Sequence, residues 1–120
     1  MENYNEVVKR TAKSCPTQEV DGPTLDLLHW ALGISGEAGE IVDPIKKHVF
    51  YNQKLDITNL QEEIGDMFYY LEALCETLGL DSDYVKLLNK QKLEQRYPNG
   101  YSDEDAKTRF DKQVDAFLND

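Results

Sequence analysis

Two pairs of acidic side chains are spaced for chemistry in this sequence of 120 residues. Glu37 and Glu40 stand among glycines and apolar residues in the stretch GISGEAGEIVD, and Glu63 and Asp66 repeat the spacing within EEIGDMFYYL. On a helix, side chains three residues apart are neighbours, with Cβ atoms about 5–6 Å from each other. Carboxylates that close repel, more strongly when they lose water, and a divalent cation removes the conflict. An all-oxygen set of this kind suits Mg²⁺ or Mn²⁺.

Helical periodicity indicates which acids point inward. At about 100° per residue, the apolar side chains between residues 60 and 78 form one stripe along a helix. Glu63 lies at the edge of that stripe, whereas Glu62 points nearly opposite to it. On the preceding helix Glu37 and Glu40 share one sector with glycines, each of which costs about 1 kcal/mol relative to alanine. The glycines therefore indicate close approach of another helix or of a ligand, and the two acidic pairs are expected to face each other across antiparallel helices.

The elements that position these acids are predicted to be helices. We find no convincing strand, and the expected helices cover residues 3–14, 24–43, 58–78, 82–96 and 102–118. At Pro44 either the second helix kinks, or Asp43 caps a short new helix through Phe50. The apolar residues of the second helix spread over a sector too wide for one neighbour. The sequence thus predicts an all-α fold, a helical bundle of four to five helices in a single domain over residues 1–120, completed by oligomerisation.

Composition and charge narrow the class of protein. The formal net charge of −10 argues against a general affinity for DNA or RNA, because phosphate contacts need a basic surface. No apolar run approaches the ~20 residues of a membrane span, and the N-terminal stretch MENYNEVVKR lacks the layout of a signal peptide. Two cysteines, Cys15 and Cys75, fit a reduced cytoplasmic protein with buried thiols better than a disulfide framework. A chain of this length should bury a real core, with a radius of gyration of roughly 14 Å.

A ferritin-like di-iron site is the obvious competitor for a bundle with inward acids. Such a site requires Glu-x-x-His motifs on two helices, and neither His29 nor His48 follows a glutamate by three positions. A single E-x-x-E or E-x-x-D motif is usually surface charge. Two such pairs, each beside the apolar stripe of a long helix and each near glycine, favour a metal site over that interpretation.

Three separated blocks resemble the MazG-like group of all-α nucleotide pyrophosphohydrolases. EAGE at 37–40 and EIGD at 63–66 resemble the E-x-x-E…E-x-x-D signature of that group, and LHWALGISGEAGEIVD resembles its first signature helix. NKQKLEQRYPNGYS at 89–102 is similar to its third block, in which N-x-x-K-L-x-x-R-Y-P precedes a glycine and an aromatic residue. The resemblance extends from Leu25 to Arg109 and departs from the group at Pro44, directly after the first acidic block.

The resemblance implies an enzyme that depends on Mg²⁺, or on Mn²⁺, and hydrolyses nucleoside or deoxynucleoside triphosphates. Cleavage between the α and β phosphates would give a nucleoside monophosphate and pyrophosphate. The chain would form a homodimer or homotetramer, with a nucleotide rather than a nucleic acid or a membrane as its partner. The metal ligands and catalytic residues would be Glu37, Glu40, Glu63 and Asp66, and the phosphate contacts Asn89, Lys92 and Arg96. Glu37 or Glu40 is the expected general base, and the sequence does not choose between them.

Two aromatic positions lie where the base or sugar of a nucleotide would reach. His29 precedes Glu37 by about two turns, on the order of 10–12 Å along the helix axis, and is expected to contact the base. Tyr70 follows Asp66 by one turn and is either a nucleotide contact or a packing residue, whereas Trp30 is expected in the core or in an interface. The alternative function is a non-catalytic nucleotide-binding or interaction module on the same bundle, and a purely structural bundle ranks third.

Overall fold

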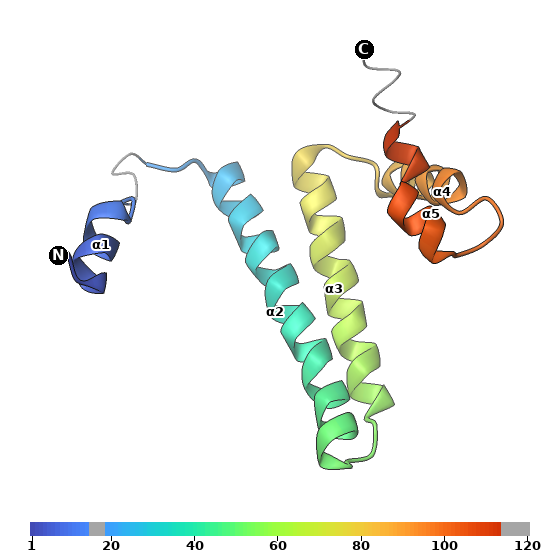
Figure 1. The fold of residues 1–120 in the computed structure, drawn as a ribbon, viewed down its shortest axis with the longest axis horizontal. Coiled ribbons are helices and arrows are strands. Elements are labelled where there is room, and N and C mark those ends of the chain that lie inside the picture. The colour runs from blue at the N-terminus through green and yellow to red at the C-terminus, as the bar shows by residue number, and fades with distance from the viewer. Residues whose placement is uncertain (15–18, 114–120) are drawn as a thin grey trace.

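A computed structural model describes residues 1–14 and 19–113 of the chain. Over these residues no strand is present, and a single bridge between Pro98 and Gly100 is the nearest approach to one. The prediction of an all-α protein is therefore confirmed. The five helices (Figure 1) are α1 (Tyr4–Thr11), α2 (Gly22–Tyr51), α3 (Ile57–Leu78), α4 (Ser82–Arg96) and α5 (Asp103–Thr108).

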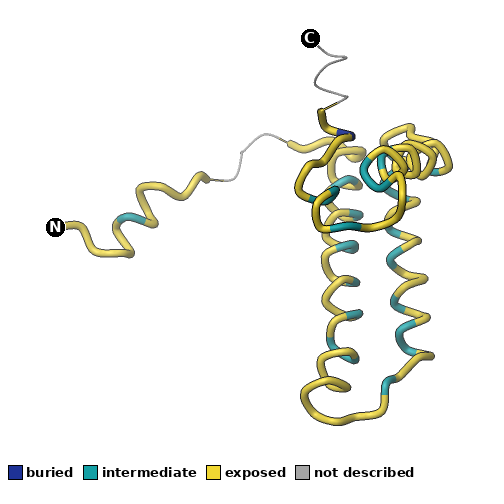
Figure 2. The backbone as a smooth tube through the Cα atoms, turned by 45° about the vertical axis from the view of Figure 1, so that its right-hand side comes forward, coloured by how far each residue is buried: buried dark blue, intermediate teal, exposed yellow. Residues whose placement is uncertain are grey.

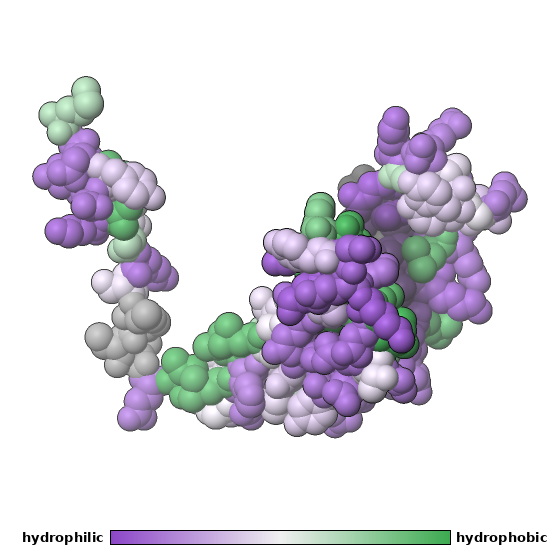
Figure 3. All heavy atoms as spheres, turned by 90° about the horizontal axis from the view of Figure 1, so that it is seen from below, coloured by the Kyte–Doolittle hydropathy of each residue, from purple (hydrophilic) through white to green (hydrophobic). Residues whose placement is uncertain are grey.

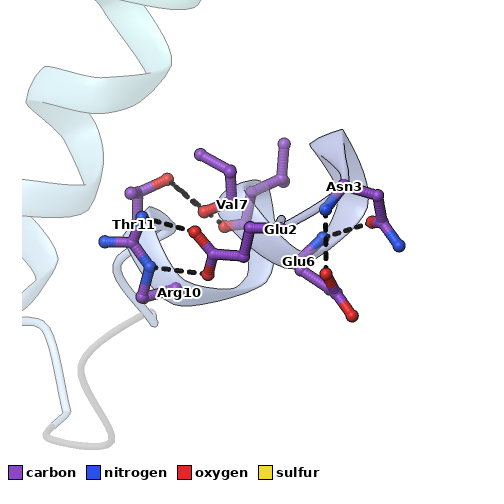
Figure 4. Close-up of polar contacts among 7 residues, drawn as sticks. Glu2, Asn3, Glu6, Val7, Arg10 and Thr11 are labelled. Atoms are coloured by element: carbon purple, nitrogen blue, oxygen red, sulfur yellow. Dashed lines mark hydrogen bonds and ion pairs between the residues drawn. The ribbon is translucent and has the colours of Figure 1, made fainter.

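Helix ends follow the capping residues that the sequence provides. At α1 the side chain of Asn3 accepts from the amide of Glu6 at 3.0 Å, and the side chain of Glu6 accepts from the amide of Asn3 at 2.8 Å (Figure 4). Short polar side chains also cap the other helices, which satisfies amides that would otherwise lack partners. These N-caps are Asp21, Asp56, Asp81 and Ser102. Gly79 ends α3 with φ 68°, a backbone conformation that glycine adopts without steric cost.

Helix α2 continues through Pro44 to Tyr51, so the alternative in which Asp43 caps a new helix is wrong. Pro44 has no amide hydrogen, and the carbonyl of Glu40 one turn earlier loses its usual donor. The Nζ of Lys47 reaches the carboxylate of Asp43 at 2.6 Å and bridges the turn that contains the proline. The loss of one hydrogen bond in thirty residues therefore leaves the helix continuous.

Helices α2 and α3 form an antiparallel hairpin, joined by a short turn at one end (Figure 1). The indole Nε1 of Trp30 donates to Oγ1 of Thr77 at 2.9 Å and joins the two helices far from that turn. Between this bond and the turn, the ring of Tyr70 lies against Gly33, where a Cβ would meet ring atoms at 2.5 Å. Gly33 is thus the glycine that the close approach of the second helix requires.

A single chain does not bury the core that its length predicts. The radius of gyration is 20.6 Å, against the roughly 14 Å of a compact domain, and no hydrophobic residue in the described part of the chain is buried. Half-buried positions lie on the sides of α2 and α3 that face each other (Figure 2). Two helices can cover only one face each, which leaves apolar side chains at the surface (Figure 3), among them Leu28, Leu32, Val49, Phe50 and Phe68. None of the helices described combines the length and apolarity that a membrane span requires.

The C-terminal helix is shorter than predicted. Helix α5 ends at Thr108, because Arg109 adopts a left-handed conformation with φ 50°. Helical residues resume at 110–113, and residues 114–118 of the predicted helix lie outside the described part. The break accompanies an ion pair between Arg96 at the end of α4 and Asp111, whose exposed fraction is only 1%. The prediction of one uninterrupted helix over 102–118 is therefore wrong at Arg109.

Candidate active site

Three carboxylates from the two long helices converge midway along the hairpin. Glu37 of α2 and Glu63 and Asp66 of α3 each offer one oxygen, and these oxygens all lie within 4.8 Å of one another. Glu37 and Glu63 are half-buried, whereas Asp66 is exposed. Glu62, next to Glu63 in sequence, is exposed, as the helical periodicity predicted.

The neighbouring carboxylates strongly affect the ionisation of Glu63. Hydrogen bonding with Glu37, and next with Glu40, together with loss of water, raises the pKa of the Glu63 carboxyl from 4.5 to about 7. The buried Oε2 of Glu37 has no hydrogen-bond partner among the described residues. A buried acceptor without a donor is costly unless a proton or a cation satisfies it. The cluster is therefore chemically suited to an oxygen-seeking divalent cation.

Glu40 lies beside this cluster, in a polar groove of about 530 Å³ that extends from the cluster to the turn between the helices. Its walls come from α2, from the turn at residues 52–56 and from the start of α3. Gly36 and Gly39 line the groove, and a Cβ at either position would meet nothing within 4 Å. These two glycines therefore leave open space beside Glu40, unlike Gly33, which accommodates Tyr70.

Four aromatic rings lie on the hairpin on the other side of the acids. His29 stacks on Trp30 with ring centroids 4.6 Å apart, and the ring of Tyr70 is 6.3 Å from each of them. Tyr69 completes the group, 5.3 Å from Tyr70. His29 is exposed, whereas Trp30 and Tyr70 are half-buried. The structure thus brings both aromatic residues proposed to contact substrate, His29 and Tyr70, to the same end of the hairpin.

The predicted phosphate contacts lie elsewhere in the chain. Asn89, Lys92 and Arg96 belong to α4, which packs chiefly against α5, whereas α2 packs against α3. The guanidinium of Arg96 donates from Nε to Oδ1 of Asp111 at 2.8 Å and from Nη2 to Oδ2 at 3.2 Å. This pairing lowers the pKa of the Asp111 carboxyl. Within one chain, therefore, the groove beside the acids does not include the α4 residues.

Several polar residues line the groove that were not predicted as site residues. Lys54 lies in the turn between α2 and α3, and Asn59 lies in the first turn of α3. Lys47 and Asp43 also line the groove and pair with each other. The available signal was topological, because a short turn between two helices that carry acids must lie at one end of the same site.

The fold and the site define an all-α protein whose two long antiparallel helices present clustered carboxylates beside a polar groove. Residues 27–101, more than half of the chain, match the MazG nucleotide pyrophosphohydrolase domain, and the chain belongs to that family. The resemblance drawn from the three sequence blocks is confirmed. Membership indicates a pyrophosphohydrolase that acts on nucleotides. No match was found among curated proteins or among solved structures.

Proposed function

We propose that this protein hydrolyses nucleoside or deoxynucleoside triphosphates to a monophosphate and pyrophosphate. The proposal rests on one observation above all, the convergence of Glu37, Glu63 and Asp66 beside a groove in a chain of the MazG family. Residues 1–120 would act as a single domain, and the cysteine usage favours the cytoplasm.

Glu37, Glu63 and Asp66 would hold Mg²⁺, or Mn²⁺, with Glu40 adjacent through its contact with Glu63. The all-oxygen donor set and the unpartnered Oε2 of Glu37 support this choice. When bound, the cation would offset the charge of the phosphates and lower the pKa of a water molecule. Either Glu37 or Glu40 would accept the proton of the attacking water, since Glu37 belongs to the cluster and Glu40 lies beside it.

The aromatic group at the other end of the hairpin would hold the base. Tyr70 is fixed against Gly33, and its ring lies about one turn from Asp66, or roughly 6 Å along the helix axis. His29 is exposed and stacks on Trp30, so its ring is available to a ligand. A planar base gains stability by stacking against such rings.

Asn89, Lys92 and Arg96 would meet the phosphates only in an assembly of chains. In one chain α4 packs chiefly with α5, away from the acids on α2 and α3. The exposed apolar side chains of α2 and α3 support a homodimer or homotetramer, because solvent exposure of so many large apolar groups is unfavourable. In such an assembly α4 of a second copy can approach the groove.

Pyrophosphate release across a panel of ribonucleotide and deoxyribonucleotide triphosphates tests the proposed function. The purified protein should release pyrophosphate with Mg²⁺ and stop when EDTA removes the metal. Nucleotide binding without turnover at any base or sugar would instead indicate a non-catalytic nucleotide-binding module. A protein that neither binds nor hydrolyses nucleotides would leave only the structural role.

A further inference from the structure

The groove beside the acids continues past Glu40 toward the turn between α2 and α3. Along the hairpin the order of features is aromatic rings, carboxylates and then groove. Lys47 and Lys54 line the far part, the first from α2 and the second from the turn. Glu40 and Lys47 are seven residues apart on the same helix, or about 10 Å along its axis.

Of the two lysines in this part of the groove, one is paired with a carboxylate and the other, among the described residues, is not. Asp43 is paired with Lys47 at 2.6 Å, and the side chain of Asp56 accepts from the amide of Asn59 at 3.0 Å. Lys54 makes no ion pair within the part of the chain that the structure describes. An exposed ammonium group beside two satisfied carboxylates is therefore the group in the groove that is available to an anion.

The lining of the groove favours a compact polar ligand over a base. No aromatic side chain is among the described residues that line it, so a base would find no ring to stack on. Gly36 and Gly39 add no side chain to the wall, and a ligand can approach their backbone closely. The volume of about 530 Å³ falls within the range of small-molecule sites.

We propose that this groove binds the two terminal phosphates of the nucleotide, with Lys54 as the cationic contact. This subsite rests on the proposed function and adds the orientation of the nucleotide along the hairpin. The base lies at the end of the hairpin that carries His29, and the diphosphate end points toward the turn. Free pyrophosphate, the product, occupies the same groove. Ammonium groups are suited to this task as mobile point charges.

Calorimetric titration with inorganic pyrophosphate in the presence of Mg²⁺ tests this assignment on the intact protein. Lys54→Ala should weaken pyrophosphate binding by about tenfold, and Lys54→Glu by more, because a charge-assisted hydrogen bond is lost or reversed. The matched control is Lys46→Ala, which removes an exposed lysine of α2 that does not line the groove. That control should bind pyrophosphate as the wild type does. Binding of a nucleoside monophosphate should change by less than about twofold in all variants.

The results of these titrations either support or reject the pyrophosphate subsite. Equal pyrophosphate affinity of Lys54→Ala and Lys46→Ala would overturn the assignment, as would a wild type that binds no pyrophosphate. If the wild type hydrolyses nucleotides while Lys54→Ala binds pyrophosphate normally, the subsite is wrong and the enzyme function stands. If pyrophosphate binding depends on Lys54 but no nucleotide is hydrolysed, the function is wrong and the anion site stands. Lys54 is exposed in a turn, and thermal melts of both variants verify that they fold.

Discussion

The guanidinium of Arg96 donates two hydrogen bonds to the carboxylate of Asp111, at 2.8 and 3.2 Å. Asp111 is 1% exposed and the Arg96 side chain 17% exposed, so water screens this pair only weakly. The pair fastens the residues after α5 to the end of α4. Arg96 was expected to address a phosphate, and in this structure an internal carboxylate already occupies part of its donor set.

Asp111→Asn should lower the melting temperature by several degrees at neutral pH, because it leaves the largely buried guanidinium of Arg96 without its counter-charge. Arg96 holds the pKa of Asp111 below its ordinary value. The stabilisation is therefore present above the unfolded pKa of about 4 and is lost as the pH falls through the lower folded pKa. Thermal melts from pH 7 to pH 2 should show the wild type and the variant converging at the acid end.

Glu104→Gln is the matched control for Asp111, since it removes an exposed carboxylate of α5. It should leave the melting temperature and its pH dependence unchanged. A loss of stability as large in Glu104→Gln as in Asp111→Asn would mean that net charge, not the ion pair, is responsible.

In the metal-free protein, Glu63 should make stability fall as the pH rises. Its pKa is 4.5 in the unfolded chain and about 7 in the folded one, so the folded state binds the extra proton between these values. The contribution of Glu63 to stability is largest below pH 4.5 and declines until the pH passes about 7. Glu63→Gln should abolish this decline and leave the metal-free protein at least as stable as the wild type at pH 8. Thermal melts in EDTA measure both effects.

Glu62→Gln provides the comparison, because Glu62 is exposed and adjacent to Glu63. It should retain the pH dependence of the wild type. Addition of Mg²⁺ should raise the melting temperature of the wild type and of Glu62→Gln, since a ligand that binds the folded state stabilises it. A wild-type melting temperature that ignores Mg²⁺ would count against a cation at this cluster.

Gly33 and Gly36 should respond oppositely to alanine. At Gly33 a Cβ would meet the ring of Tyr70 at 2.5 Å, and overpacking of this kind costs about 1–3 kcal/mol. At Gly36 a Cβ would meet nothing within 4 Å, and alanine should stabilise the helix by roughly 0.5–1 kcal/mol. Denaturant unfolding distinguishes the two. Because Gly36 lines the groove, Gly36→Ala should also weaken substrate binding, and a stable variant with unchanged KM would remove Gly36 from the site.

Self-association should depend on the apolar face of α3. Phe68 is 64% exposed, and Phe68→Glu should convert the predicted dimer or tetramer to smaller species as measured by light scattering. Tyr4→Ser, which removes an aromatic ring of α1 that is 81% exposed, serves as the control and should leave the assembly intact. A wild type that is monomeric at assay concentration would contradict the expectation of an oligomer.

Local periodicity accounts for the parts of the fold that were predictable from sequence. The start of α4 and the end of α3 at Gly79 follow from capping residues and from the preference of glycine for positive φ. The inward orientation of Glu63 rather than Glu62 follows from the angle per residue and matches their burial. The approach of a helix to Gly33 was likewise anticipated from the cost of glycine in a helix.

Long-range packing decides what local patterns could not. Pro44 costs α2 one backbone hydrogen bond at a single turn, and the helical turns on both sides of it keep the helix continuous. The break at Arg109 accompanies the ion pair between Arg96 and Asp111. These two residues are fifteen positions apart in the sequence, so helical periodicity does not relate them. The expected core was missed because length alone does not say whether apolar faces meet within one chain. Lys54 was missed because its role depends on the path of the turn between α2 and α3.

Pyrophosphate release by Glu37→Gln and Asp66→Asn, with Glu62→Gln as the control, tests most directly whether the clustered carboxylates perform the reaction. Wild type and Glu62→Gln should release pyrophosphate from a nucleoside triphosphate, lose this activity in EDTA and regain it with Mg²⁺. Each of the other two variants should be slower by about a hundredfold or more, because it replaces one charged carboxylate of the converging set with a neutral amide. Wild-type activity in Glu37→Gln and Asp66→Asn would contradict the claim that these carboxylates perform the reaction.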